Sequence, residues 1–452
     1  MTQTMMMLIQ YLEPYIKGMQ SRMRICGLAG LCLSVLTISA CGGSSGDGID
    51  PGIIEIPIAF IKRPIPVDDM GADAQADLRD PRFFGQGGDV YLRSSSAVGA
   101  TVTNITGAVT GGRGDVKGLN ASYDGSKLIF SLRLFDPDPD DDVVPSWNIY
   151  EYDIENQTLR QVIPPSISED GDDLYPSYLP DDRIVFTSSR QEQAEANLLN
   201  EGKPIFSAVV EDEDTIALVL HVMNPDGSDI HQISSNLSND LYPQVLTRTN
   251  AGQIVYSRWD KAAGDKGLHL YRSNPDGSNN EVLYGSHSHA TGTSNSDIHF
   301  TNIREMPNGN LMVIAKPYTG TFDGGDILII DKNRFVDFDK PVWSQSGLGG
   351  PAQRSATVAD VATDGSLSLD GRYSSAFPLQ DGSNRMLVSR STCQVNDGGE
   401  IRACESSDIS DPGVQEVSPA YSIWLYDLDE DTARPMVLAE RGQVITLSLI
   451  HI

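Results

Sequence analysis

Three histidines have the residue type and spacing that could ligate a transition metal or a haem. His287 and His289 are separated by one residue in the run GSHSHATG, and Asp297 and His299 follow closely. Imidazole nitrogens bind transition metals and haem iron, and a neighbouring carboxylate can orient them. The run is also rich in Gly and Ser, so a polar connector between two elements is the alternative interpretation. We keep His287, His289 and His299 as candidate metal or haem ligands.

An acidic run over residues 136–142, DPDPDDD, is a candidate calcium loop. Ca²⁺ prefers carboxylate oxygens, and the run offers them at alternate positions, from Asp136, Asp138, Asp140 and Asp142. The Gly and the Glu that occupy the sixth and twelfth positions of an EF-hand loop are replaced here by Asp141 and Trp147. Two prolines also restrict the loop. A solvated acidic loop is therefore the alternative to a Ca²⁺ site.

None of the cysteines belongs to a C-x-x-C pair, so the sequence has no zinc-ribbon site and no attachment site for covalent haem. Cys393 and Cys404 enclose ten residues that include a Gly-Gly turn. In an oxidising compartment such a pair is expected to form a disulfide, and we predict one here with a structural role. The sequence also lacks a zincin motif, a P-loop and a dinucleotide fingerprint. We therefore predict no catalytic residue.

The charge of the chain excludes one class of partner. The sequence has 33 Lys and Arg against 62 Asp and Glu, which gives a net charge of −29. Nucleic-acid binding depends on neutralising phosphates with a basic surface. We therefore expect no nucleic-acid partner.

The N-terminal residues have the pattern of an export signal. Arg22 and Arg24 precede a short apolar stretch, residues 25–38, and small residues follow it. The end of this stretch, Ile-Ser-Ala-Cys at residues 38–41, resembles the lipobox of bacterial lipoproteins. The resemblance implies cleavage before Cys41 and lipidation of that residue. Because Gly42 follows and not Asp, it also implies sorting to the outer membrane, facing the periplasm.

These observations divide the N-terminal part into two segments. Residues 1–40 are predicted to be a signal peptide whose true start is Met19 or Met23, since Glu13 is unusual ahead of such a signal. Residues 41–52 are the lipidated Cys and a Gly- and Ser-rich flexible tether. The predicted partner of this part is the membrane, through the lipid anchor.

A long-period repeat fills the rest of the chain. Six apolar β-runs end on a basic or polar residue, at residues 58–63, 127–133, 183–190, 253–259, 310–316 and 385–390. Turns containing Asp-Gly, Asn-Gly or similar pairs precede most of them, as tight hairpins require. A second β-run follows each, at residues 89–93, 148–153, 220–227, 268–277, 326–331 and 422–429. Four short antiparallel strands per repeat predict an all-β, six-bladed β-propeller.

Two families share these patterns. YPSYLPDDRIVFTSSR (175–190) with LHVMNPDGSDIHQI (220–233) resembles the WD40-like PD40 repeats of TolB-type periplasmic propellers. IPIAFIKRPIP (56–66), GGDVYLR (87–93) and WNIYEYD (147–153) are similar to the propeller middle domain of the hydrazine synthase alpha-subunit family. The resemblance implies a propeller over residues 53–441. Residues 442–452 are expected to be a tail, and its apolar end, VITLSLIHI, suggests a truncated reading frame. It implies no reaction, because the C-x-x-C-H motifs of that family's haem regions do not occur here.

Three functions follow as hypotheses. The first is a membrane-anchored periplasmic propeller that binds a ligand or an envelope protein. The second is the propeller portion of a haem-dependent redox protein related to the hydrazine synthase alpha subunit. Its haem would come from a missing region or from a partner such as a c-type cytochrome. The third is a rigid spacer within an envelope complex.

Overall fold

The described part of the chain is built from β-strands. The computed structural model describes residues 57–67, 73, 75–97, 99–138, 140–141, 143–191, 202, 216–260, 267–411, 413–440 and 442–449. These residues lie in one compact unit that spans residues 51–452. Helical structure among them is limited to α3 (Gly107–Thr110) and to short 3-10 turns. None of the described helices is long and apolar enough to cross a membrane.

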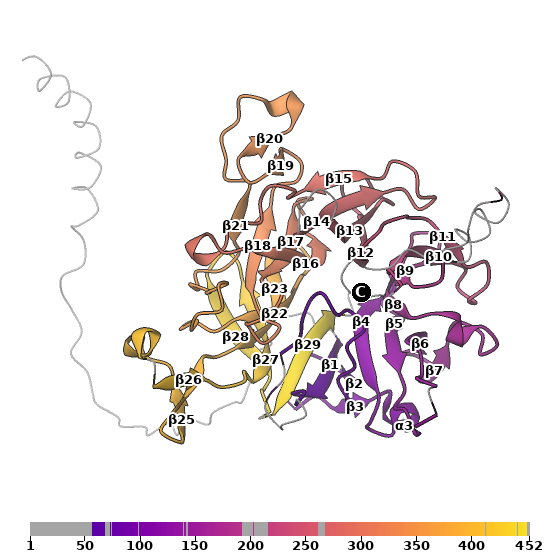
Figure 1. Cartoon of the computed structure of the whole chain (residues 1–452), viewed down its shortest axis with the longest axis horizontal. Coiled ribbons are helices and arrows are strands. Elements are labelled where there is room, and N and C mark those ends of the chain that lie inside the picture. The colour runs from indigo at the N-terminus through magenta and orange to yellow at the C-terminus, as the bar shows by residue number, and fades with distance from the viewer. Residues whose placement is uncertain are drawn as a thin grey trace, which may run out of the picture. The chain divides into compact units, whose positions relative to one another are not determined.

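The described residues of this unit form six antiparallel sheets of four strands (Figure 1). The first contains β29 (Gln443–Leu449), β1 (Ile58–Pro64), β2 (Asp89–Arg93) and β3 (Val102–Asn104). The second contains β4 (Asp115–Ala121), β5 (Lys127–Arg133), β6 (Asn148–Asp153) and β7 (Thr158–Gln161). The third contains β8 (Asp173–Tyr178), β9 (Ile184–Ser188), β10 (Val219–Met223) and β11 (His231–Gln232).

The remaining sheets follow the same order along the chain. The fourth contains β12 (Asp240–Val245), β13 (Ile254–Asp260), β14 (Gly267–Ser273) and β15 (Glu281–Tyr284). The fifth contains β16 (His299–Glu305), β17 (Leu311–Lys316), β18 (Asp326–Ile330) and β21 (Gln353–Ser355). The sixth contains β22 (Tyr373–Pro378), β23 (Arg385–Ser391), β27 (Tyr421–Asp427) and β28 (Thr432–Val437).

Two insertions interrupt the last two sheets. A hairpin of β19 (Phe335–Asp337) and β20 (Lys340–Pro341) lies between β18 and β21. A small sheet of β24 (Gln394–Asp397), β25 (Glu400–Ala403) and β26 (Val414–Glu416) lies between β23 and β27. Each insertion therefore extends a connection between neighbouring strands and leaves the four-stranded sheet intact.

The predicted repeat is confirmed at the level of strand register. The six apolar runs form β1, β5, β9, β13, β17 and β23, the second strand of each sheet. Their aligned residues each lie directly opposite a residue of the third strand, at Phe60, Phe130, Phe186, Tyr256, Val313 and Val388. All six are buried, because these strands are covered on both faces by neighbouring sheets.

The first strands of the sheets lie next to one another. Strand β29 contacts β4, and the contacts continue through β8, β12, β16 and β22, which contacts β29 again. Residues 442–452 were predicted to be a tail, but β29 pairs along β1 from Pro64–Gln443 to Ile58–Leu449 (Figure 1). Ile445 and Leu447 are buried there against Leu387 and Ile423. Its apolar residues therefore complete the first sheet.

Candidate binding site between the first strands

The first strands share a local irregularity that shapes the space between them. In β4, β8, β12 and β16 the register with the second strand shifts at the same place, as in a β-bulge. The residue at the shift has a positive φ in each strand, at Gly118 (63°), Tyr175 (54°), Tyr242 (56°) and Asn302 (51°). Bulges of this kind redirect side chains and are common next to functional sites.

The first paired residue after each bulge is polar. These residues are Asn120, Ser177, Gln244 and Arg304, opposite Ile129, Val185, Val255 and Met312. In β22 the residue at this register is apolar, because Phe377 lies opposite Leu387. Since the register is equivalent in the other four strands, their polar side chains lie at one level of the first strands. We call Asn120, Ser177, Gln244 and Arg304 the polar ring.

Two cavities meet at the polar ring. The cap-side cavity, of about 150 Å³, is lined by the first strands, by β1 and by residues of the 76–83 segment. The turn-side cavity, of about 350 Å³, is lined by residues at the opposite ends of the first strands and by the turns that follow them. Asn120, Gln244 and Arg304 line both cavities. The polar ring is therefore the boundary between the two halves of a channel.

A segment of the β1–β2 connection, residues 75–87, covers the cap side, and we call it the cap. The Leu78 N–H donates to the Tyr318 carbonyl at 3.0 Å, and Leu78 is buried. The Lys117 ammonium donates to the Pro81 carbonyl at 2.8 Å. The indole N–H of Trp147 donates to the Arg82 carbonyl at 3.1 Å. The cap is thus held by residues of the second and fifth sheets.

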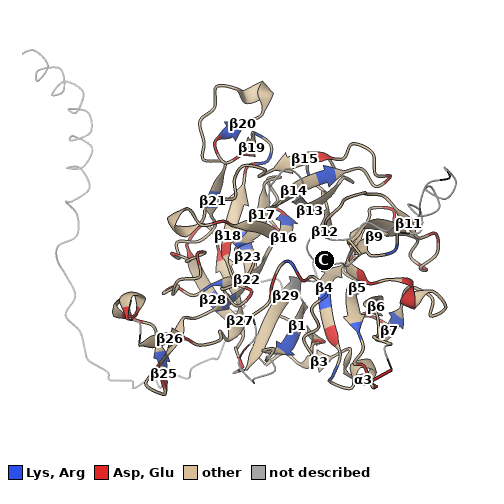
Figure 2. Cartoon of the chain, in the orientation of Figure 1, with Lys and Arg blue, Asp and Glu red and all other residues tan. Residues whose placement is uncertain are grey.

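The charges of the cap-side cavity are largely balanced. Arg63 lies 3.7 Å from a carboxylate oxygen of the buried Asp115, and Lys316 forms an ion pair with Asp323. Burial lowers the pKa of Lys117 to about 8, with Asp115 acting in the opposite direction. The cavity lining includes Arg63 of β1 and Lys117 of β4, strands that carry blue segments in Figure 2. Each of these three cations therefore has an acidic neighbour.

Arg304 has a different environment. Its guanidinium donates to the Ile303 carbonyl at 3.3 Å and lies 5.3 Å from the centre of the Phe377 ring. Burial lowers the pKa of Arg304 to about 10. The side chain stays protonated at neutral pH, so it places a positive charge at the polar ring.

Tyr175 and Tyr242 line the cap-side cavity, and each lies two residues before a member of the polar ring, Ser177 or Gln244. Their ring centres are 4.5 Å apart, and burial raises the pKa of both hydroxyls above the usual value. A proline follows each of these tyrosines, so the sequence repeats a Tyr-Pro pair at this position. The bulge explains that repetition, since both tyrosines occupy the residue with positive φ.

The structure separates the three candidate histidine ligands. His289 and His299 are buried with ring centres 5.4 Å apart, whereas His287 is exposed and lies 3.5 Å from Asp337. His269 on β14, which the sequence analysis did not select, lies 5.7 Å from His289. His299 stacks on Tyr318 at 3.7 Å, and burial, followed by His289, lowers its pKa to about 3. This cluster is a closely packed part of the core.

The acidic run lies in the connection between β5 and β6. Asp136 accepts a hydrogen bond from the Asp138 N–H at 3.0 Å, and Asp140 is exposed. Asp142 lies outside the described residues. Within the described part of the chain, no three His, Cys, Asp or Glu side chains are grouped as a metal site requires. The Ca²⁺ and haem sites remain predictions.

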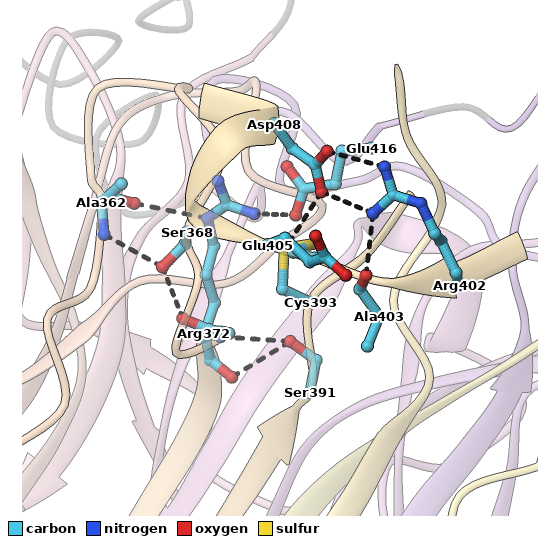
Figure 3. The surroundings of a disulfide bond; sticks show 12 residues. Ala362, Ser368, Arg372, Ser391, Cys393, Arg402, Ala403, Glu405, Asp408 and Glu416 are labelled. Atoms are coloured by element: carbon cyan, nitrogen blue, oxygen red, sulfur yellow. Dashed lines mark hydrogen bonds and ion pairs between the residues drawn. A yellow bond between two sulfur atoms is a disulfide. The ribbon is translucent and has the colours of Figure 1, made fainter. Parts of the chain in front are cut away.

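Cys393 and Cys404 are joined by a disulfide with their Cα atoms 5.5 Å apart (Figure 3). Arg402 makes two 2.7 Å hydrogen bonds to Asp408, and Arg372 forms an ion pair with Glu416. The Arg402–Asp408 bonds lie within the β24–β26 insertion, whereas the Arg372–Glu416 pair ties it to the start of β22 in the sixth sheet. Cys41, the predicted lipidation site, lies outside the described residues.

Similarity to known proteins lies in the fold. No protein-family model and no curated protein matches the sequence. The structure is similar to hydrazine synthase of Kuenenia stuttgartiensis, with a TM-score of 0.57 and 15% identity over 88% of this chain. The match covers 47% of that chain, so the present chain spans about half the length of the hydrazine synthase chain.

Two other solved structures are more distant. A puromycin hydrolase matches 78% of this chain and 42% of its own, with 10% identity and a TM-score of 0.41. A putative TolB of Agrobacterium tumefaciens matches 50% of this chain and 88% of its own, with 14% identity and a TM-score of 0.29. The predicted resemblance to propellers is therefore confirmed at the level of fold, on the hydrazine synthase match.

Proposed function

We propose that the chain is a lipid-anchored, six-bladed β-propeller that acts by binding a ligand or an envelope protein on the periplasmic side of the outer membrane. Six four-stranded sheets with contacting first strands support the propeller. The export signal and Cys41 support the anchor. The absence of a catalytic motif in the sequence favours binding over catalysis.

The capped channel is the observation that carries this proposal. Lys117, Trp147 and Tyr318 hold the cap over one end, whereas the turn-side cavity at the other end has about 350 Å³. Binding sites in proteins are concave and usually have a volume of a few hundred Å³. A ligand or a protruding partner segment would therefore enter from the turn side and stop at the polar ring.

A photo-crosslinking amino acid tests where the partner binds. Tyr123 lines the turn-side cavity and is half exposed, so a crosslinker at this position would report on an occupant of the mouth. Val282 on β15 has a similar exposed fraction, 40%, but lies on the outer strand of its sheet, and it serves as the matched control. In native membranes we expect a discrete adduct from position 123 and none from position 282.

The same experiment tests the anchor. A Cys41→Ser change in the Tyr123 crosslinking variant removes the lipidated residue and the cleavage signal, so we expect the protein to leave the outer-membrane fraction. Equal adducts from positions 123 and 282, or none from either, would contradict binding at the turn-side mouth. A Cys41→Ser protein that stays in the outer-membrane fraction would contradict the lipid anchor alone.

The likeness to hydrazine synthase favours a second candidate function. The chain would then be the propeller portion of a haem-dependent redox protein, since the match covers about half of that chain. A covalent haem would have to come from outside this sequence, which has no C-x-x-C-H motif. A haem-staining c-type cytochrome that co-purifies with the full chain would support this function.

A further inference from the structure

We propose that the polar ring binds a small carboxylate monoanion, with Arg304 as the residue that contacts the carboxylate. This inference rests on the proposed function, because it names the class of ligand for the same channel. Three observations carry it: the charge of Arg304, the hydrogen-bonding groups around it and the size of the cavities on either side.

Arg304 carries a charge that no acidic side chain balances within the described part of the chain. The adjacent Glu305 is held elsewhere, since its carboxylate accepts hydrogen bonds from the N–H groups of Thr247, Arg248 and Thr249 at 2.5 to 3.1 Å. Glu305 also lies 4.0 Å from Lys332. The guanidinium of Arg304 has five N–H donors, and its one hydrogen bond to Ile303 uses only a part of them. A partly buried cation of this kind favours an anionic ligand.

The other polar residues at this level offer acceptors. The amide nitrogen of Asn120 donates to the Pro176 carbonyl at 2.8 Å, and that of Gln244 donates to the Pro243 carbonyl at 2.8 Å. Each bond fixes which end of the amide faces the backbone. Among the described residues, neither amide oxygen accepts a hydrogen bond, so both can accept one from a ligand. Hydroxyl groups beside the carboxylate would satisfy them.

Charge and volume narrow the class of ligand. One guanidinium balances one negative charge and matches the planar fork of a carboxylate with two parallel hydrogen bonds. A phosphate dianion would leave a charge unbalanced in a partly desolvated channel, at added electrostatic cost. A cavity of about 150 Å³ holds a molecule as large as benzene. A hydroxy acid of six or seven heavy atoms therefore fits the site.

Lactate is the probe, and lactamide is its neutral counterpart of the same shape. We expect the full chain in detergent to bind lactate in the millimolar range by titration calorimetry, and to bind lactamide at least tenfold more weakly. Arg304→Gln is expected to weaken lactate binding at least tenfold. Arg304→Lys keeps the charge but loses the fork, so we expect an intermediate affinity. The control Arg434→Gln removes an exposed arginine from β28 and is expected to leave binding unchanged.

A melting curve separates loss of the site from loss of the fold. Because Arg304→Gln removes a desolvated charge, we expect its melting temperature to equal or exceed that of the wild type. Lactate binding that survives in Arg304→Gln, equal binding of lactamide, or tighter binding of inorganic phosphate would each overturn the inference. If lactate fails to bind while position 123 still gives its adduct, the ligand class is wrong and the proposed function stands.

Discussion

Burial raises the pKa of one carboxyl group, and the stability of the protein therefore depends on pH. Asp326 is the first residue of β18 and accepts a hydrogen bond from the Ser355 hydroxyl at 3.0 Å. Burial raises the pKa of Asp326 to about 7, and this hydrogen bond opposes the shift. In the unfolded chain the same group titrates near pH 4. Between these two values the folded protein therefore holds a proton that the unfolded chain has released.

The sign of the pH dependence follows from this difference. Where the folded state binds more protons, the free energy of unfolding falls as pH rises. We expect Asp326 to lower stability progressively from about pH 4 to about pH 7, by at most on the order of 4 kcal/mol. Asp326→Asn removes the charge, so this variant should match the wild type at pH 4 and exceed its stability at pH 8. Chemical unfolding at several pH values measures the difference.

The exposed Glu430 provides the control for that prediction, because Glu430→Gln changes the net charge equally. Its unfolding curve is expected to differ from that of the wild type by the same small amount at pH 4 and pH 8. If Asp326→Asn shows no greater gain at pH 8 than Glu430→Gln, the raised pKa of Asp326 is wrong.

Only a part of the candidate site could be predicted from the sequence. The Tyr-Pro pairs at Tyr175 and Tyr242 were recognisable because they recur before equivalent turns. Arg304 could not be recognised from the sequence, because the run HFTNIRE does not indicate a bulge at Asn302. That bulge determines the register of Arg304, the next paired residue of the strand. His269 was missed because it lies on a strand distant in sequence from His289, and only the packing of two sheets brings them together.

Among the elements, the β24–β26 insertion depends on polar contacts and on its disulfide. Its strands are mostly exposed, and Val395 is a buried exception. Glu405 and Asp408 form a capping box at the 3-10 turn that follows β25, and Arg402 binds Asp408 (Figure 3). Because few apolar side chains are buried in the insertion, we expect the covalent bond between Cys393 and Cys404 to stabilise much of its structure.

Removing this bond should destabilise the protein measurably. Closing a loop of this length stabilises the folded state by about 3 kcal/mol in the chain-entropy description. We expect the double variant Cys393→Ala and Cys404→Ala to lose about that amount in denaturant unfolding. A reductant should shift the wild-type curve equally and should not shift the curve of the double variant. A wild-type curve that is insensitive to the reductant would contradict this role.

The second and third strands of the sheets were predicted from the sequence, whereas the first strands were not. The second and third strands of each sheet were found because both their faces are buried, which gives continuous apolar runs such as KLIFSLR of β5. The first strands carry the polar ring and the bulges, and DVKGLNA of β4 has no comparable signal. Strand β29 was taken as a tail because its partner β1 lies almost the whole length of the chain away, a pairing that no local pattern reveals.

For the molecule as a whole, pairing of β29 with β1 joins the last described strand to the first sheet. The neighbouring sheet contributes as well, since the Ile445 carbonyl accepts a hydrogen bond from the Ser389 hydroxyl and the Leu447 N–H donates to the Ser375 hydroxyl. Ser375 lines the cap-side cavity, as do Thr446 and Leu447 of β29. Closure of the first sheet and the geometry of the candidate site are therefore coupled through β29.

Two truncations of the same chain test this coupling. A chain that ends at Gly442 lacks β29, and a chain that ends at Leu449 retains it. Burial of Ile445 and Leu447 contributes on the order of 4 kcal/mol, a large part of the stability of a typical domain. Without β29 the edge of β1 is also left unpaired, which favours aggregation. We therefore expect the shorter chain to melt at a lower temperature, to elute as larger species in size-exclusion chromatography and to lose lactate binding. Equal melting temperatures and elution volumes of the two chains would show that the first sheet closes without β29. The polar ring would then have to be held by the other five first strands alone.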